Sequence, residues 1–139
     1  MIREIEEKDF EKVYQLGELL HPNYRNLYPM ERMLKEPYFH VLVYEENREI
    51  LGFLSYTDLK VSIDILDVVI EKLHRRNKIG TNLLDYAITS STPGCEIYIE
   101  VDTKNEPAIS LYDKFGFEIV GKREKYYQKN DAYVMKRVI

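Results

Sequence analysis

The sequence predicts a mixed α/β domain in which helices pack on a central sheet. Two neighbouring patterns in the second half of the chain carry this prediction. Apolar residues between Ile79 and Ile88 recur at the spacing of one helix face. Apolar and polar residues then alternate strictly from Cys95 to Asp102, as in a strand with one buried face. A switch from helical to strand periodicity within one chain is typical of α/β proteins.

The first half is expected to place a short strand and two helices before three strands. Asp9 stands where it can cap a helix whose apolar residues recur from Phe10 to Leu20. A loop with two prolines, residues 21–29, separates that helix from a shorter one. In chain order we expect a strand at 2–5, helices at 10–20 and 30–35, and strands at 39–44, 50–56 and 63–70.

The second half is expected to end in a helix and a hairpin. Asn105 can cap a helix with Pro107 in its first turn, where a missing amide costs nothing. Gly116 falls where a left-handed residue closes a helix. Strands at 118–127 and 132–138 then form the hairpin. The complete order is β-α-α-β-β-β-α-β-α-β-β, with about seven strands and about four helices.

The composition indicates one folded domain, residues 1–139, in the cytoplasm. Hydrophobic residues make up 45% of the chain and charged residues 32%, enough apolar surface for a core. The N-terminus is charged from its third residue, unlike a secretory signal. A single cysteine, Cys95, excludes an intramolecular disulfide or a Cys-rich zinc cluster. We expect no metal site.

The charge distribution narrows the class of ligand. A net charge of −4 argues against non-specific nucleic-acid binding, and no apolar run approaches the ~20 residues that cross a membrane. Lys72 to Lys78 is nevertheless a basic run without an acid, and it joins a strand to a helix. Such a junction offers backbone amides and a positive helix end to phosphates. The alternative is a solvated basic turn.

The basic junction resembles the pyrophosphate loop of the GNAT superfamily of acetyl-CoA-dependent N-acetyltransferases, whose pattern is Q/R-x-x-G-x-G/A. Arg75 fills the first position and Gly80 the last. Lys78 replaces the first glycine, which costs steric freedom if a positive φ is needed there. With Gly80 as its one glycine, the segment matches neither a Walker A loop nor a GxGxxG fingerprint.

A second block strengthens the resemblance. Residues 105–117, NEPAISLYDKFGF, are similar to the superfamily's pattern N-x-x-A-x-x-L-Y-x-x-x-G-F. The segments IEV, YY and DAYVM resemble the branch that acetylates protein N-termini, including the ribosomal-protein-alanine acetyltransferases. The stretch 128–131 between YY and DA is shorter than that branch's usual hairpin, so the substrate gate is expected to differ.

The resemblance implies a GNAT fold, acetyl-CoA as co-substrate, and direct acetyl transfer to a primary amine without a covalent enzyme intermediate. It places pantetheine and acetyl binding at an opening of the sheet near Val68 and Ile70; a fully paired central strand is the alternative. The implied cofactor-binding residues are Val68, Ile70, Arg75, Arg76, Asn77, Lys78, Ile79, Gly80, Thr81, Asn105, Ala108 and Tyr112.

Two residues are candidates for proton transfer. Tyr112 matches the motif tyrosine; a phenol, protonated at neutral pH, can donate to the departing thiolate. Its alternative role is core packing. Glu100 lies on the polar face of its strand, where relatives carry a glutamate or histidine as base. A solvated strand edge is the alternative for Glu100.

The acceptor is expected to contact tyrosines. Tyr126 and Tyr127 are implied to hold the substrate backbone, with strand packing as the alternative, and Tyr24 and Tyr28 are candidates for the same groove. The first choice of acceptor is the N-terminal amine of a protein or peptide. The second is a small-molecule amine. A non-catalytic acyl-CoA-binding regulatory module is the third interpretation.

Overall fold

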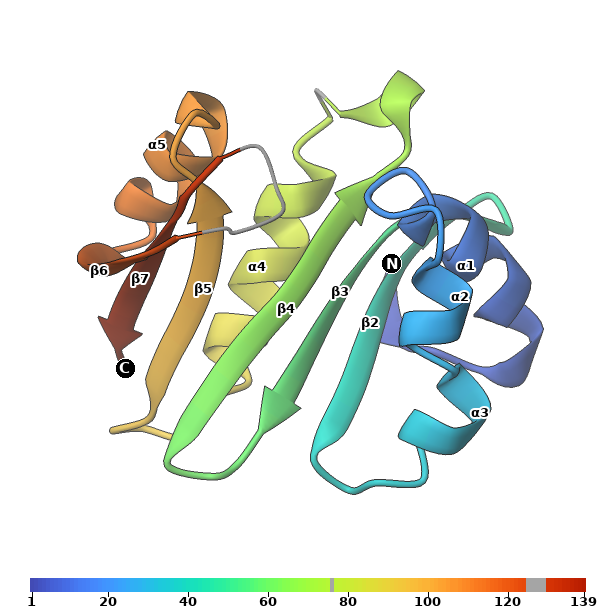
Figure 1. Ribbon diagram of the computed structural model, residues 1–139. Coiled ribbons are helices and arrows are strands. Elements are labelled where there is room, and N and C mark those ends of the chain that lie inside the picture. The colour runs from blue at the N-terminus through green and yellow to red at the C-terminus, as the bar shows by residue number, and fades with distance from the viewer. Residues whose placement is uncertain (76, 125–129) are drawn as a thin grey trace.

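The protein is built on one seven-stranded sheet (Figure 1). The computed structural model describes residues 1–75, 77–124 and 130–139. The sheet order is β1-β2-β3-β4-β5-β7-β6, and only the β4–β5 pair is parallel. The strands are β1 (Ile2–Glu4), β2 (Phe39–Glu46), β3 (Glu49–Asp58), β4 (Ser62–Ile70), β5 (Glu96–Asp102), β6 (Glu118–Arg123) and β7 (Ala132–Val138).

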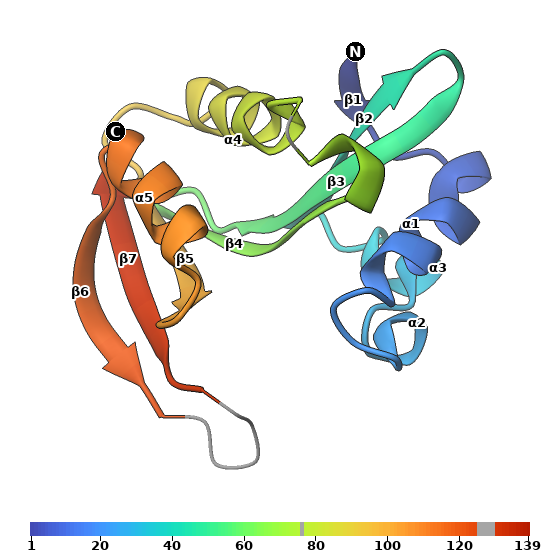
Figure 2. The same ribbon diagram turned by 90° about the horizontal axis from the view of Figure 1, so that it is seen from above.

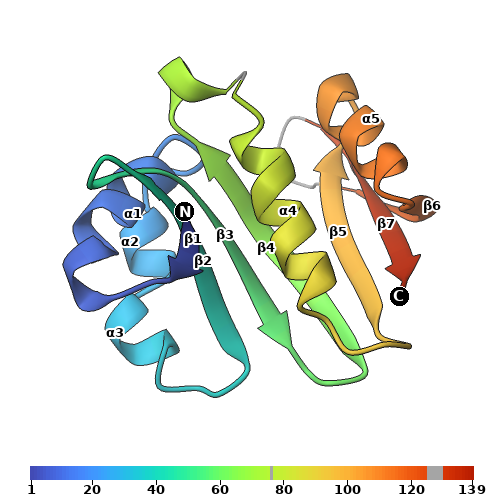
Figure 3. The same cartoon turned by 180° about the vertical axis from the view of Figure 1, so that it is seen from behind.

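Helices cover the two faces of the sheet unequally (Figures 2 and 3). The helices are α1 (Phe10–Gly17), α2 (Tyr24–Leu27), α3 (Met30–Met33), α4 (Ile79–Thr89) and α5 (Glu106–Lys114). One core joins α4 and α5 to one face, around Leu54, Leu83 and Ile97. The other joins α1 to α3 to the opposite face of β2–β4, around Val13 and Phe53. The β5–β7 part of the sheet therefore carries a helix on one face only.

The sheet divides into two arms between β4 and β5. Their parallel pairing runs from Ser62–Glu96 to Ile65–Ile99 and is not continued toward the strand ends. Beyond it, the two strands diverge (Figures 1 and 3). A bulge at Leu66 coincides with this point, because Tyr56 pairs with Ile65 and Ser55 with Asp67. The expected opening near Val68 and Ile70 is confirmed, and a fully paired central strand is excluded.

The first helix begins at Phe10 as predicted, but its cap and its C-terminal end differ from the prediction. Asp9 precedes α1, but its carboxylate accepts hydrogen bonds from Arg3 and from the Glu6 amide instead of capping α1. The helix ends at Gly17, not at residue 20, and the loop predicted at 21–29 contains α2. The Tyr24 ring packs so closely on Gly17 that a Cβ there would lie 2.3 Å from it. This tertiary contact, invisible to periodicity, fixes where the chain turns.

The later elements follow the sequence closely. Asn105 caps α5, with its side-chain oxygen accepting from the Ala108 amide at 3.3 Å. Gly116 closes the helix at a φ of 87°. The apolar residues of β5 are buried, as predicted from their alternation. Within the described ranges, none of the helices has the length and hydropathy to cross a membrane.

Candidate active site

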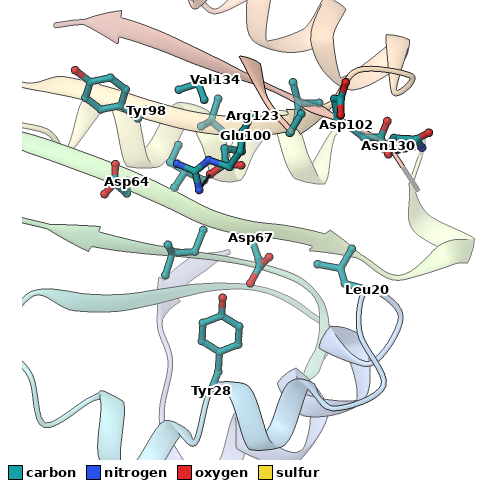
Figure 4. Close-up of a pocket in the computed structure, with 16 residues that line it drawn as sticks. Leu20, Tyr28, Asp64, Asp67, Tyr98, Glu100, Asp102, Arg123, Asn130 and Val134 are labelled. Carbon is teal, nitrogen blue, oxygen red and sulfur yellow. Dashed lines mark hydrogen bonds and ion pairs between the residues drawn. The ribbon is translucent and has the colours of Figure 1, made fainter. Parts of the chain in front are cut away.

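A groove of about 930 Å³ lies between the two arms, on the face opposite α4 and α5 (Figure 4). Its walls are β4 and β5, and the β6–β7 hairpin and the chain around α2 form its ends. Carboxylates dominate the polar lining, and Arg123 is the basic residue among the described lining residues. The lining includes Leu20, Tyr28, Asp64, Leu66, Asp67, Tyr98, Glu100, Asp102, Arg123, Asn130, Asp131 and Val134.

The β5 wall presents the polar side of that strand. Glu100 lines the groove as predicted, and its carboxylate lies 3.0 Å from the Arg123 guanidinium. The Asn130 side chain donates to Asp102 at 2.9 Å, which ties the chain just before β7 to the end of β5. The side chains of Asp102 and Asn130 are visible side by side near the end of β5 in Figure 4. The structure thus brings Glu100 into the groove, where its side chain remains 37% exposed, and its role as a base stays a prediction.

The β4 wall carries a half-buried carboxylate, Asp67. The Tyr24 hydroxyl donates to it at 3.1 Å. Burial raises the pKa of the Asp67 carboxyl, and the hydrogen bond from Tyr24 opposes this only in part. Tyr28 lies across from Asp67 in the groove (Figure 4), and burial together with the Asp67 charge raises its pKa. Tyr24 itself is only 1% exposed and does not line the groove, in contrast to its prediction. Its connection to the groove is the hydrogen bond to Asp67.

The strand-to-helix junction has the geometry of an anion site. A 3-10 turn, Lys72–His74, leads from β4 to α4, and Lys78 precedes the helix at φ 60° and ψ 23°. That left-handed conformation is the one that glycine adopts without strain, which explains the glycine in the superfamily pattern. The first-turn amides of α4 have no partner inside the helix. They and the positive helix end suit a phosphate.

Several predicted cofactor-binding residues gather at this edge of the sheet. Lys78 and Asn77 are exposed before α4, and Ile79 is buried beneath its first turn. The Arg75 side chain donates to the Ile70 carbonyl at 3.3 Å. Val68 and Ile70 pack against Gly80, where an added Cβ would lie 3.7–3.9 Å from them, an ordinary contact. The starts of α4 and α5 flank the opening between β4 and β5 (Figures 1 and 3).

The other arm supplies the α5 residues. Asn105 is exposed at the start of the helix, Ala108 is half-buried, and Tyr112 is 9% exposed against the core. Burial raises the pKa of Tyr112 to about 12. Its ring centroid lies 6.1 Å from that of Phe117. The ring therefore packs in the core and the phenol keeps its proton at neutral pH, whereas the role of Tyr112 as an acid stays a prediction.

Some site residues were predicted and others were not. Arg76, Tyr126 and Tyr127 lie outside the described residues, and Thr81 is half-buried in the first turn of α4. Asp67 escaped the sequence reasoning. Its signal was nevertheless present, since it is an acid inside the aliphatic run ILDVVI. Arg123 and Asn130 gave no comparable signal, because the hairpin register alone brings them to the groove.

Comparisons with known proteins agree with this geometry. The profile of a family described as "Acetyltransferase (GNAT) family" matches residues 1–117. An N-alpha-acetyltransferase of Sulfurisphaera tokodaii is 28% identical, over 96% of this chain and 90% of its own length. The solved structure of Ard1 from Thermoplasma volcanium is 26% identical with a TM-score of 0.82, over 100% of this chain and 97% of that one. Naa50 of Arabidopsis thaliana, in complex with the bisubstrate analogue CoA-Ac-MVNAL, is 26% identical with a TM-score of 0.79, over 99% of this chain and 97% of that one.

Proposed function

This chain belongs to the acetyltransferase (GNAT) family, and on that premise we propose that it acetylates the α-amine at the N-terminus of a protein or peptide. The activity itself is acetyl transfer from acetyl-CoA to an amine. The observation that carries the proposal is the fork between β4 and β5, with the proposed anion site on one side and an acidic groove on the other. A fork of this kind gives two ligands separate entrances to one reaction centre.

The residues before and within the first turn of α4 fit the diphosphate of acetyl-CoA. Arg75 and Lys78 supply positive charge, and the first-turn amides, including those of Gly80 and Thr81, supply donors. Val68 and Ile70 lie beyond the part of β4 that pairs with β5, so we propose that the pantetheine arm and the acetyl carbonyl bind along this β5-facing side of β4. Acetyl-CoA supplies an acetyl group already activated as a thioester.

Two side chains are proposed to handle the protons. Tyr112, on α5, keeps its phenolic proton at neutral pH, and we propose that it donates this proton to the departing thiolate. Glu100, on the opposite face, is proposed to accept the proton of the attacking amine, directly or through water. An α-amine, with a pKa near 7.7–8.0, needs less help from a base than a lysine side chain near 10.4.

The preference for an N-terminus rests on the character of the groove and on the relatives. The groove is open along β4 and β5, which suits an extended peptide, and its carboxylates suit an ammonium group. The relatives reported above are an N-alpha-acetyltransferase, Ard1 and Naa50, the last bound to an analogue with a five-residue peptide. Tyr28 and Leu20 at the α2 end are proposed to contact the acceptor, as are Tyr126 and Tyr127.

Matched acceptors test this proposal. Peptides with a free α-amine, and the same peptides with a formylated N-terminus, are incubated with the protein and acetyl-CoA while free thiol is measured. A panel of polyamines, aminoglycosides and amino acids runs in parallel. We expect turnover with free peptides only, and mass spectrometry should place the acetyl group on the first residue. Turnover restricted to the small amines would overturn the protein-acceptor assignment.

A further inference from the structure

We propose that Asp67 binds the ammonium group of the acceptor and fixes it at the fork, an inference that rests on the proposed function. It adds a substrate-binding carboxylate on β4 to the candidate base on β5. Three observations support it: the place of Asp67 in the strand, the way Tyr24 holds its carboxylate, and the lack of a cation beside it among the residues that the structure describes.

The β4 bulge sets the direction of Asp67. Leu66 is the additional residue, after which Asp67, Val68 and Val69 pair in register with β3. Successive side chains then point to opposite faces of the sheet. Val68 packs against the α4 core while Asp67 lines the groove. The carboxylate therefore projects into the groove directly beside the backbone of Val68, which is proposed to hold the thioester.

Tyr24 holds the Asp67 carboxylate in a fixed position. Its hydroxyl donates to Asp67, and its ring packs against Phe53 and Tyr28 at centroid distances of 5.8 Å and 4.8 Å. The ring occupies the space that a side chain at position 17 would need, so the glycine there is what lets Tyr24 sit in this place. Burial and the neighbouring Asp67 charge raise the pKa of Tyr24, so its hydroxyl remains a donor.

Asp67 has no cationic partner in the part of the chain that the structure describes. The contrast is Asp9, another partly desolvated acid of this arm, which binds Arg3 through two hydrogen bonds of 2.7 Å and 3.0 Å. A desolvated carboxylate with a single hydroxyl donor retains strong affinity for a positive charge. Leu66 and Tyr28 border it with apolar surface. An ammonium group entering the groove fits this environment.

Steady-state kinetics with a peptide acceptor tests the role of Asp67. Asp67→Asn should raise the KM for the peptide about ten- to a hundredfold, the range for losing a hydrogen bond to a charged group. The Kd for acetyl-CoA should stay within about twofold of wild type, since only the acceptor is affected. Tyr24→Phe should raise KM in the same direction by less. Asp85→Asn, the same change on the solvent side of α4, is the control and should leave KM unchanged.

A second measurement isolates charge recognition from folding. The inhibition constant of the peptide is compared with that of its α-hydroxy isostere, which is neutral at the same position. Wild type should favour the amine, and Asp67→Asn should abolish that preference. Equal preferences in the two proteins would overturn the role of Asp67 while leaving the proposed function intact. Wild-type turnover of small amines alone would overturn the acceptor class, and the Asp67→Asn defect should then persist with those amines. No turnover of any amine would overturn both.

Discussion

The two arms of the sheet differ in how many of their faces are covered by helices. In the β1–β4 arm, β3 is buried on both faces for most of its length, because α4 covers one side and α1 to α3 the other. In the β5–β7 arm, every second residue of β5 is exposed or half-exposed, because α5 covers one side only. Burial on both faces favours apolar side chains, and Ser55 is the buried polar residue of β3. The proposed site therefore lies where one arm ends and the uncovered face of the other begins.

The largest expected effect comes from α5. Tyr112→Phe keeps the aromatic packing but removes the proton that the thiolate requires, so kcat should fall about a hundredfold or more. The Kd for acetyl-CoA should change little. Because the pKa of Tyr112 is about 12, its titration contributes no limb to the pH–rate profile of wild type below that pH. Tyr86→Phe, on the exposed side of α4, is the control. An unchanged kcat for Tyr112→Phe would remove it from catalysis.

The next effect is on the free energy of unfolding, and it comes from Asp9 in the β1–β4 arm. Burial alone would raise the pKa of Asp9, but the hydrogen bonds from Arg3 and the Glu6 amide outweigh it and lower the pKa. Asp9→Asn should cost about 1–3 kcal/mol in the free energy of unfolding at neutral pH. Urea denaturation of this variant and of Asp113→Asn, an exposed control, measures it.

The pH dependence of that loss follows from the direction of the shift. A carboxyl whose pKa is lowered by folding stabilises the protein above its unfolded pKa, near 3.9. This contribution disappears as the pH falls through the lowered folded value. The wild type and Asp9→Asn should therefore converge in stability in acid. A gap that stays constant from neutral pH into that acid range would contradict the assigned role of the Arg3 contact.

A smaller effect separates backbone strain at Lys78 from its contribution to acetyl-CoA binding. Lys78 and Lys60 both have left-handed backbones, with φ of 60° and 76°, but only Lys78 lies at the proposed anion site. Replacing either by glycine should raise the free energy of unfolding by up to about 1 kcal/mol, because relief of strain slightly exceeds the added chain entropy. Only Lys78→Gly should weaken acetyl-CoA binding, severalfold, as measured by calorimetry. Equal affinities for the two variants would argue against a phosphate at this turn.

The smallest effect is expected at the rim of the groove. Arg123 and Glu100 are 63% and 37% exposed, and ion pairs of this kind contribute about 1 kcal/mol or less. Arg123→Gln should change the free energy of unfolding by less than that. It should lower kcat/KM by less than about fivefold, as steady-state assays can show. A larger loss of activity would make Arg123 a substrate-binding residue rather than a partner of Glu100.

The two arms were also unequally predictable from sequence. The β5–α5 segment follows local rules, from strict alternation through the Asn105 cap to the left-handed Gly116, and its motif carries the family resemblance. The segment around α2 does not follow local rules. The contact between Gly17 and Tyr24 ends α1 early, and Tyr24, which was predicted to line the groove, is buried against Gly17. Local patterns report the period of an element. They carry no information on which distant ring will pack on a glycine.

The acidic groove shows the same limit. Glu100 could be placed because its strand alternates, whereas the direction of Asp67 depends on a bulge that the sequence of β4 does not reveal. Likewise, Arg123 reaches Glu100 only through the pairing of β6 with β7 and of β7 with β5. Residues brought together by one element were predictable, and those brought together by strand register were not.

A crystal structure of the protein with coenzyme A tests the central claim most directly. The account predicts the diphosphate against Lys78 and the first turn of α4, with the pantetheine arm between β4 and β5 and its thiol between Tyr112 and the acidic groove. A coenzyme bound elsewhere, with the gap between the two strands filled by side chains, would contradict it.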